Sequence, residues 1–310
     1  MKVLVTGSAG VIGQSLVPFL RERGHEVVGF DIRNDLTQDV TDEAAIWRAF
    51  EDGPHICIHM AAQVGRITGE EHPHMSVRSN MIGTLNVARA CNDHCCFLIN
   101  FSTSEVYGHN SVLGQPDILA QNGIYGLTKL GAEGIVKHYV DTYILRAVSI
   151  RPFMCYGPHE TPNGVYRSAV SNFIAAAHRG EPFVAHAGCS RSWCFISDFC
   201  EGLALVLDNL DQFHGYEAFP IGTEEYRSMQ ECAEIVKKVV GGEYTVQEPP
   251  KHLLSTVKQA DFSRIKGLGF QPKVGLEEGV ERTYRWMLEN GVLDGGIGTV
   301  ARQVRRALGN

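Results

Sequence analysis

The chain begins MKVLVTGSAGVIG (residues 1–13), and this stretch decides the fold. Residues 2–6 are mostly β-branched and apolar, which is typical of a buried strand. Glycines then recur at every third position: Gly7, Gly10 and Gly13. The apolar run at 11–20 that follows has the character of a helix. Glycines between a strand and a helix allow a sharp turn and let backbone N–H groups approach a pyrophosphate at the helix N-terminus. The stretch therefore predicts a dinucleotide-binding unit.

The composition is that of an ordinary globular protein. The 310 residues are 44% hydrophobic and 20% charged, with a formal net charge of −7 and no long basic run. We therefore expect no nucleic-acid partner, and no apolar run approaches the ~18 residues of a membrane span. The nine cysteines include no C-x-x-C pair and no histidine at zinc-finger spacing. We expect reduced thiols in a cytoplasmic protein without a metal site.

Strand and helix patterns alternate along the first half of the chain. We predict further strands at 26–30, 55–60, 97–101 and 144–150, helices at 43–50 and 80–92, and a helix that carries Tyr125 and Lys129. This alternation predicts an α/β fold, a Rossmann-type doubly wound parallel sheet, over residues 1–165 with returning segments near 194–222. Residues 63–74 contain two glycines and Pro73 and are expected to form a loop over the site.

The pattern changes in the second half. Residues 166–310 are expected to form a smaller mixed α/β substrate domain and a C-terminal tail with helical spacing after Gly291. We predict helices at 168–178, 229–240 and 276–290, short strands at 183–187 and 219–222, and a strand followed by a helix at 194–210.

Polar residues follow the strands that end at the predicted binding edge. Asp31 ends the second strand, about 20 residues past the glycines, where a carboxylate accepts hydrogen bonds from a ribose and repels a 2′-phosphate. Arg33 argues against this repulsion, because its positive charge attracts a 2′-phosphate. Residues 102–105 (Ser-Thr-Ser-Glu) follow the strand at 97–101, and ligands bind at the carboxyl ends of parallel strands. Tyr125 and Lys129 lie four residues apart, on one face of a helix.

Five motifs in this order resemble one known family. They are 6–13 (TGSAGVIG), 59–62 (HMAA), 80–86 (NMIGTLN), 102–108 (STSEVYG) and 125–129 (YGLTK). As a set they are similar to the extended short-chain dehydrogenase/reductase family, which contains the nucleotide-sugar epimerases and dehydratases. Arg191, followed by ISD at 196–198, resembles that family's sugar-nucleotide region. The resemblance covers most of the chain, from residue 1 to about residue 290.

The resemblance implies an NAD-dependent enzyme that removes hydride from a sugar hydroxyl. Tyr125 would be the general base, although a phenol with a pKa near ~10 is too weak a base at neutral pH. Lys129 and the positive nicotinamide ring are expected to lower that pKa, and Thr103 would hydrogen-bond the reacting oxygen. Ser104 and Glu105 complete the implied catalytic set.

The resemblance also implies binding roles. The implied NAD-binding residues are Gly7, Ala9, Gly10, Val11, Ile12, Gly13, Asp31, Ile32, Arg33, Asp39, Val40, Met60, Ala61, Ala62, Asn80, Ser102, Tyr125, Lys129 and Phe153. The implied contacts to a nucleotide-diphosphate sugar are Gln63, Arg66, Thr103, Met154, Asn172 and Arg191. A homodimer is implied, through the helices that start near Asn80 and Tyr125.

Two positions depart from the family pattern and bear on the reaction. Met154 stands where the family commonly has an asparagine, and a thioether cannot donate a hydrogen bond. Ser104 stands where 4,6-dehydratases carry an aspartic acid, and serine is a poor acid. We therefore expect a nucleotide-sugar 4-epimerase acting through a transient 4-keto sugar with recycled NAD. Open alternatives are a UDP-glucuronate decarboxylase, a nucleotide-sugar dehydratase, a net dehydrogenase and a non-catalytic NAD-binding sensor.

Overall fold

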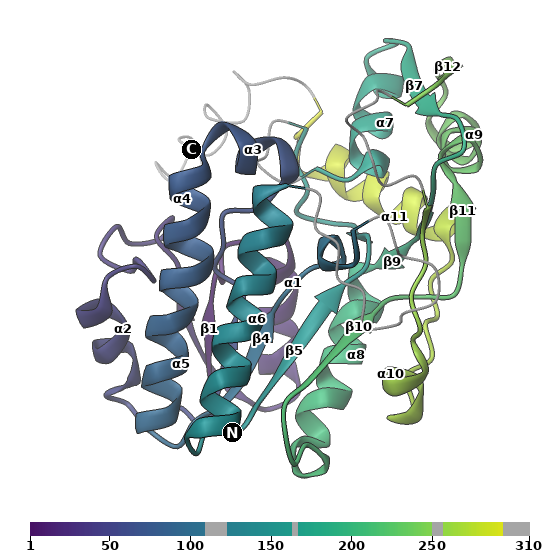
Figure 1. Cartoon of the computed structure of the whole chain (residues 1–310). Helices are drawn as coiled ribbons and strands as arrows, with labels where there is room; N and C mark the ends of the chain where they lie inside the picture. The colour runs from purple at the N-terminus through teal and green to yellow at the C-terminus, as the bar shows by residue number, and fades with distance from the viewer. Residues whose placement is uncertain (109–122, 163–166, 250–256, 294–310) are drawn as a thin grey trace, which may run out of the picture.

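A six-stranded parallel sheet runs through the centre of the molecule (Figure 1). The structure is a computed structural model that describes residues 1–108, 123–162, 167–249 and 257–293. The sheet contains β1 (Lys2–Thr6), β2 (Glu26–Phe30), β3 (Ile56–His59), β4 (Phe97–Phe101), β5 (Ala147–Pro152) and β10 (Glu217–Ile221), in the order β10-β5-β4-β3-β1-β2. The direction of the strand order changes between β1 and β3, and ligands bind beyond the carboxyl ends at such a point. The predicted Rossmann-type parallel sheet is confirmed.

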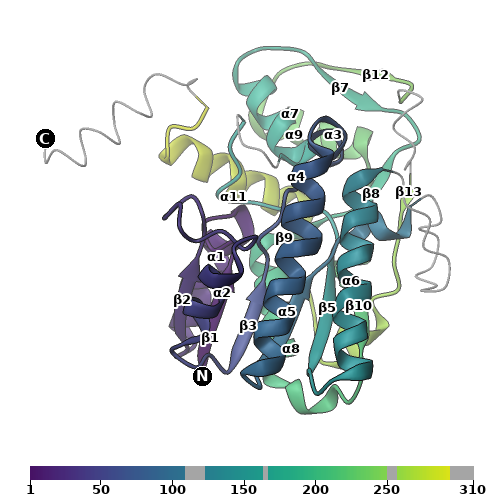
Figure 2. The same ribbon diagram turned by 60° about the vertical axis from the view of Figure 1, so that its left-hand side comes forward.

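Helices cover both faces of the sheet (Figure 2). The helices α1 (Val11–Glu22) and α8 (Ile196–Asp208) pack on one face, and α2 (Glu43–Phe50), α5 (Gly83–Asp93) and α6 (Ile124–Thr142) pack on the other. Alternate residues of β1 belong to different clusters, because successive side chains of a strand point to opposite faces. Val3 and Val5 pack with Leu16 of α1, whereas Leu4 packs with Ile46 of α2 and Val87 of α5.

Smaller elements lie above the carboxyl ends of the strands (Figure 1). Two short helices lie near the amino ends of the strands instead: η3 (Leu210–Gln212), whose Leu210 O accepts from Arg146 Nη2 just before β5, and α10 (Ser263–Gly267), whose Arg264 Nε donates to Glu217 Oε2 at the start of β10. The elements above the carboxyl ends are β6 (Cys155–Tyr156), α7 (Ala169–His178), β7 (Phe183–His186), β8 (Ser190–Ser192), β9 (Cys194–Phe195), β11 (Tyr226–Ser228), α9 (Met229–Val240), β12 (Tyr244–Gln247), β13 (Val257–Lys258) and α11 (Leu276–Glu289). They pair as β11-β8-β13, β12-β7 and β6-β9. The predicted domain boundary near 165 stays a prediction, since one buried cluster contains side chains from both halves. The helix predicted in the tail lies outside the described residues.

The structure corrects the interpretation of residues 63–74 as a loop. They contain α3 (Arg66–Glu71) and the start of α4 (Pro73–Val77), and α4 continues through a π-helical turn, η1 (Arg78–Ile82), into α5. The helix predicted at 80–92 is therefore the end of a longer helical segment. Pro73 occupies the first position of α4, where its missing N–H costs no hydrogen bond. Its presence marks a helix start here.

Other boundaries follow the local capping chemistry. The Asp42 side chain accepts a hydrogen bond from Ala44 N and begins α2, and the Ser168 side chain caps α7 in the same way. The strand predicted from 144 begins only at Ala147. In the part of the chain that is described, no helix has the length and apolar character to span a membrane.

Candidate active site

The glycine turn between β1 and α1 is sterically required. Gly7 has a φ of +73°, and a Cβ there would lie 2.7 Å from Ala61 N. A Cβ on Gly13 would lie 2.4 Å from Ser8 O. The turn therefore brings the start of α1 against the backbone that follows β3, next to the strand-order switch. This places Ala61 and Ala62 beside the predicted pyrophosphate position.

Asp31 lies buried at the end of β2 and faces the glycine turn. Its Oδ2 accepts a hydrogen bond from Ala9 N at 2.8 Å, and its Oδ1 accepts one from Arg33 N at 2.9 Å. The Arg33 side chain is largely exposed, with Nε 3.6 Å from Asp31 Oδ1. Ile32 between them is also exposed. At the end of β2 the Asp31 carboxylate is thus the buried charge, and the Arg33 guanidinium is the exposed one.

We predict from this corner that the protein binds NAD more tightly than NADP. A 2′-phosphate would be brought against the Asp31 carboxylate, and such like-charge contacts cost several kcal/mol. We expect the dissociation constant of NADP to exceed that of NAD by ~10-fold or more. Titration of both dinucleotides by intrinsic fluorescence measures this. An Asp31→Ser variant should narrow the ratio, and tighter binding of NADP to the unaltered protein would refute the prediction.

Asn80 holds the segment after β3 in place. Its Oδ1 accepts from Gln63 N at 2.8 Å, and its Nδ2 donates to Gln63 O at 3.1 Å and to Thr128 Oγ1 at 3.0 Å. The backbone of a predicted substrate contact is therefore tied to α6, one residue before Lys129. Further along, Asp39 accepts from Thr41 N within its own turn, and Val40 packs beneath Gly83.

The residues present fit a bound dinucleotide. Among the described residues, the buried Oγ atoms of Ser8 and Ser102 have no hydrogen-bond partner. Ser102 is a predicted cofactor residue at the end of β4, so its hydroxyl group is available there for a polar ligand. Ser8 is not a predicted cofactor residue, although it lies between the predicted Gly7 and Ala9, and its Oγ faces Gly29 of β2. The Phe153 side chain, by contrast, is fully buried and packs against the rings of Tyr107 and Phe262.

Tyr125 and Lys129 lie one turn apart on α6, and both are buried. The Tyr125 and Thr103 side chains are hydrogen-bonded to each other. Thr103 also caps the short helix η2 (Ser104–Tyr107) by accepting from Glu105 N. The structure therefore brings together three residues from β4's carboxyl end and α6 that sequence analysis assigned to one reaction.

The pKa of Tyr125 differs from the expected one. Burial raises the pKa of Tyr125 to about 12, and the Glu105 charge adds to the increase, while the Thr103 hydrogen bond opposes it. Burial also lowers the pKa of Lys129 to about 8. The pKa of Tyr125 thus lies above its usual value, because the cost of removing the phenolate from water dominates. The expected lowering of that pKa by Lys129 and the nicotinamide ring stays a prediction.

A buried ion pair that the sequence motifs do not predict lies behind Lys129. Glu133 accepts from Arg151 Nε at 2.8 Å and from Nη2 at 2.7 Å, and Arg151 Nη1 also donates to Tyr107 OH at 3.0 Å. The Glu133 charge raises the pKa of Lys129, against the effect of burial. A signal was present, since Glu133 continues the four-residue spacing of Tyr125 and Lys129.

The predicted substrate contacts form a charged group beside this centre. Arg66 begins α3, and Arg191 lies on β8. The charges of both arginines lower the pKa of Cys189, although burial raises it more, and the Glu105 charge raises the pKa of Arg191, against burial. Arg191 therefore lies near both Glu105 and Arg66, whereas Asn172 lies on an exposed face of α7.

Met154 has a backbone conformation that favours the residue it replaces. Its φ is +35°, a left-handed conformation in which asparagine is enriched and methionine is not. Its carbonyl accepts from Cys194 N at 3.3 Å, linking β6 and β9, and its side chain packs partly buried against the hydrophobic core. The turn therefore presents a thioether and no polar side chain at this position.

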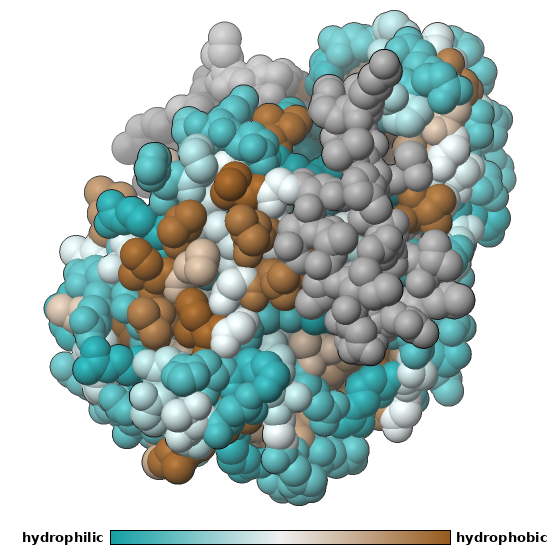
Figure 3. Space-filling model, viewed as in Figure 1, coloured by the Kyte–Doolittle hydropathy of each residue, from teal (hydrophilic) through white to brown (hydrophobic). Residues whose placement is uncertain are grey.

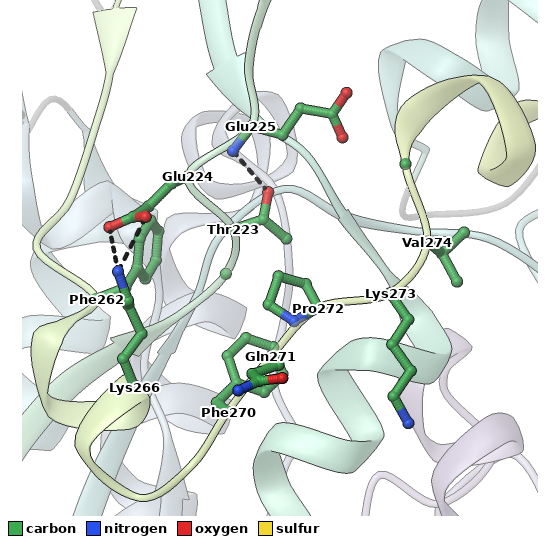
Figure 4. Close-up of a pocket in the computed structure, with 12 residues that line it drawn as sticks. Thr223, Glu224, Glu225, Phe262, Lys266, Phe270, Gln271, Pro272, Lys273 and Val274 are labelled. Atoms are coloured by element: carbon green, nitrogen blue, oxygen red, sulfur yellow. Dashed lines mark hydrogen bonds and ion pairs between the residues drawn. The ribbon is translucent and has the colours of Figure 1, made fainter.

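A separate cavity of about 380 Å³ lies between the loop after β10 and the loop before α11 (Figure 4). The Glu224 carboxylate pairs with Lys266 Nζ at 3.0 Å at its edge, and Phe262 lines it. Phe262 separates this cavity from Phe153, and its lining includes none of the predicted catalytic, cofactor or substrate residues.

Comparison with known proteins agrees with this geometry. The sequence model of the NAD dependent epimerase/dehydratase family matches residues 3–222. The UDP-glucuronate 4-epimerase of Thermodesulfobacterium geofontis is 29% identical over 318 residues, covering 93% of this chain and 96% of that protein. Among solved structures, the UDP-glucose 4-epimerase of Thermus thermophilus in complex with NAD has a TM-score of 0.82 and 26% identity, over 96% of this chain and 100% of that one. The UDP-glucuronic acid 4-epimerase of Bacillus cereus, in complex with UDP-glucuronic acid and NAD, has a TM-score of 0.82 and 25% identity, over 93% of this chain and 99% of that one.

Proposed function

Since the chain belongs to the NAD dependent epimerase/dehydratase family, we propose that it inverts C4 of a UDP-sugar through a transient 4-keto sugar, with UDP-glucuronate as its preferred substrate. The observation that carries the proposal is the buried Tyr125, hydrogen-bonded to Thr103 and one turn from Lys129. The Glu105 charge acts on Tyr125 and on Arg191, and Arg66 lies near Arg191. The similar proteins named as UDP-sugar 4-epimerases support it.

The proposed cofactor residues surround the strand-order switch. Bound NAD supplies hydride acceptance and return. The glycine turn would hold its pyrophosphate, Asp31 its adenosine ribose, and Lys129 its nicotinamide ribose. Ser102, with its unpartnered buried hydroxyl, would offer a hydrogen bond near the reacting end. These assignments use the chain's own donors and acceptors.

The proposed proton transfer runs through Tyr125. The tyrosine takes the proton of the C4 hydroxyl and later returns it to the oxygen of the keto sugar, while Thr103 donates a hydrogen bond to that oxygen. A pKa of about 12 makes phenolate scarce at neutral pH, so a cation beside the ring is needed to favour it. Lys129, with its pKa of about 8, remains largely protonated at neutral pH and supplies such a charge within one helical turn.

Two features favour epimerisation over decarboxylation. A 4-keto uronate is a β-keto acid. It loses carbon dioxide when the bond between C5 and the carboxylate carbon breaks and its electron pair moves into the C4 ketone. Arg66 and Arg191 would hold the carboxylate as an ion pair and stabilise it in that form. Met154 offers no polar contact to fix the intermediate, and an epimerase must let the keto sugar turn to receive hydride on its other face.

Product analysis tests the proposal. The protein is incubated with UDP-glucuronate, UDP-glucose and a panel of GDP-, dTDP- and CDP-sugars, and products are identified by mass and NMR. We expect UDP-glucuronate to give its C4 epimer at unchanged mass. Loss of carbon dioxide or of water, or release of reduced cofactor, would instead establish decarboxylation, dehydration or net oxidation.

A single substitution tests the substrate preference. Arg66→Ala should raise the KM for UDP-glucuronate by ~10-fold or more, the scale of a lost charged hydrogen bond, and should change the KM for UDP-glucose little. An equal effect on both sugars would show that Arg66 does not contact the carboxylate.

We also propose that two copies of the chain pair through α4, α5 and α6. Figure 3 shows a group of hydrophobic residues on this face. Met75, Ile82, Leu85 and Leu127 are exposed there, at 39–54% of their full area. Adjacent exposed apolar side chains mark interaction surfaces, and an identical face on a second copy meets it by two-fold symmetry. Light scattering should give a dimer that Leu85→Arg converts to monomer, while Leu288→Arg, on α11, leaves the dimer intact. A monomeric unaltered protein at micromolar concentration would refute the dimer.

A further inference from the structure

The helix that carries Tyr125 and Lys129 begins without a cap of its own. The N-cap position of α6 is Gly123, whose φ is +124° and which has no side chain to accept a hydrogen bond. The first N–H groups of a helix lack partners within the helix and need an acceptor from elsewhere. Here Glu70 Oε1 accepts from Ile124 N at 2.9 Å. The acceptor thus comes from α3, 54 residues earlier in the chain.

Glycines on both sides make this contact possible. A Cβ on Gly123 would lie 2.8 Å from Glu70 Oε1. A Cβ on Gly69 would lie 3.0 Å from Tyr125 N and 3.2 Å from Tyr125 Cβ. The backbone of α3 at Gly69 therefore lies directly against the backbone of Tyr125, because glycine has no side chain to separate them. Figure 1 shows α3 across the start of α6.

We propose that α3 is the element that positions the general base, with Glu70 and Gly69 as positioning residues for Tyr125. The inference rests on the proposed function, in which Tyr125 moves the proton. Glu70 fixes the first turn of α6 along the helix axis, and Gly69 sets how closely the two backbones approach. Neither residue touches the substrate.

The same short helix connects the base to the sugar. Arg66 is the first residue of α3, and Gly69 and Glu70 follow within one turn. A sugar carboxylate bound at Arg66 would therefore contact α3, the same helix that positions Tyr125. Misplacing a catalytic group by 1 Å costs about 10²-fold in rate, so a displacement of a few tenths of an ångström is expected to have a measurable effect.

Three variants of α3 separate positioning from general stability. Glu70→Ala removes the cap, Glu70→Gln keeps an oxygen acceptor at the same place, and Glu71→Ala alters the exposed neighbour as a matched control. We expect Glu70→Ala to lower kcat by about 3–10-fold with the KM for the UDP-sugar and the affinity for NAD within twofold, consistent with a small displacement of the base. Glu70→Gln should recover most of kcat, and Glu71→Ala should behave as the unaltered protein.

Gly69→Ala tests whether the close approach of the α3 and α6 backbones sets the turnover rate. Alanine favours a helix over glycine, but its Cβ would lie 3.0 Å from Tyr125 N, so a merely structural role for Gly69 predicts a change in thermal stability and unchanged turnover of the folded protein. We expect kcat to fall ~10-fold in this variant while the melting temperature is kept, because the new methyl group presses on Tyr125. Unchanged kcat in both Gly69→Ala and Glu70→Ala would overturn the proposal.

Amide hydrogen exchange at the start of α6 tests the Glu70 cap without measuring activity. Exchange of peptides covering 123–129 should speed up in Glu70→Ala and not in Glu71→Ala, whichever sugar is the substrate. If no UDP-sugar is turned over, the proposed function fails and exchange still tests the cap. Unchanged exchange would overturn the cap, and faster exchange with unchanged kcat would overturn the positioning role.

Discussion

Turnover of the sugar is expected to fall by about 10²-fold or more when Tyr125 is replaced by phenylalanine, the usual scale for losing a general acid–base group. The substitution removes one hydroxyl and keeps the buried ring, so α6 and its packing are preserved. The hydrogen bond to Thr103 is lost together with the group that moves the C4 proton. NAD affinity should remain within about twofold, since Tyr125 contributes mainly to the transition state.

Lys129→Met is the companion variant that separates the two roles. Lys129 is proposed both to hold the nicotinamide ribose and to favour the phenolate, so this variant should lose NAD affinity as well as rate. Steady-state kinetics and NAD titration of the two variants give the comparison. Near-normal turnover of Tyr125→Phe would remove the tyrosine from the mechanism, whatever Lys129→Met does.

The largest expected effect on folding comes from Glu133→Ala. Glu133 and Arg151 are both buried and joined by two hydrogen bonds, at 2.8 and 2.7 Å. Removing the carboxylate leaves the Arg151 guanidinium without its anion in the interior, and breaking such a pair costs about 3–5 kcal/mol of unfolding free energy. Lys129 loses a neighbouring negative charge as well, which should lower its pKa further.

Equilibrium urea unfolding measures this loss. The matched control is Glu278→Ala, which removes an exposed carboxylate paired with Arg282 on α11 and should cost within about 1 kcal/mol. Replacing both members, as in Glu133→Met with Arg151→Met, should recover part of the loss, because no unpaired charge remains. A cost for Glu133→Ala no larger than that for Glu278→Ala would contradict the assigned role of the pair.

Local sequence signals predicted the elements that position the site. The glycines at 7, 10 and 13 predicted the turn because their spacing has a steric cause, which the close contacts of Gly7 with Ala61 now show. The helix at 229–240 was predicted to the residue, and a reciprocal cap between Ser228 and Glu231 begins it. In these cases the residues that determine the structure are neighbours in the chain.

Contacts between distant segments account for what was wrong or missed. Gly69 and Pro73 suggested a loop, yet Gly69 packs against Tyr125 and Pro73 starts a helix. The pKa of Tyr125 depends on burial, which the four-residue spacing to Lys129 does not reveal. The roles assigned to the site residues by resemblance stay predictions, although the structure brings Tyr125, Thr103 and Lys129 together.

The most direct test of the account follows hydrogen at C4. UDP-glucuronate carrying deuterium at C4 is incubated with the protein, and the product is examined by NMR and mass spectrometry. The account predicts a C4 epimer that retains the deuterium at C4, has the mass of the labelled substrate, and forms more slowly than from the unlabelled sugar. Exchange of the deuterium with solvent, or a product lacking the carboxyl group, would contradict it.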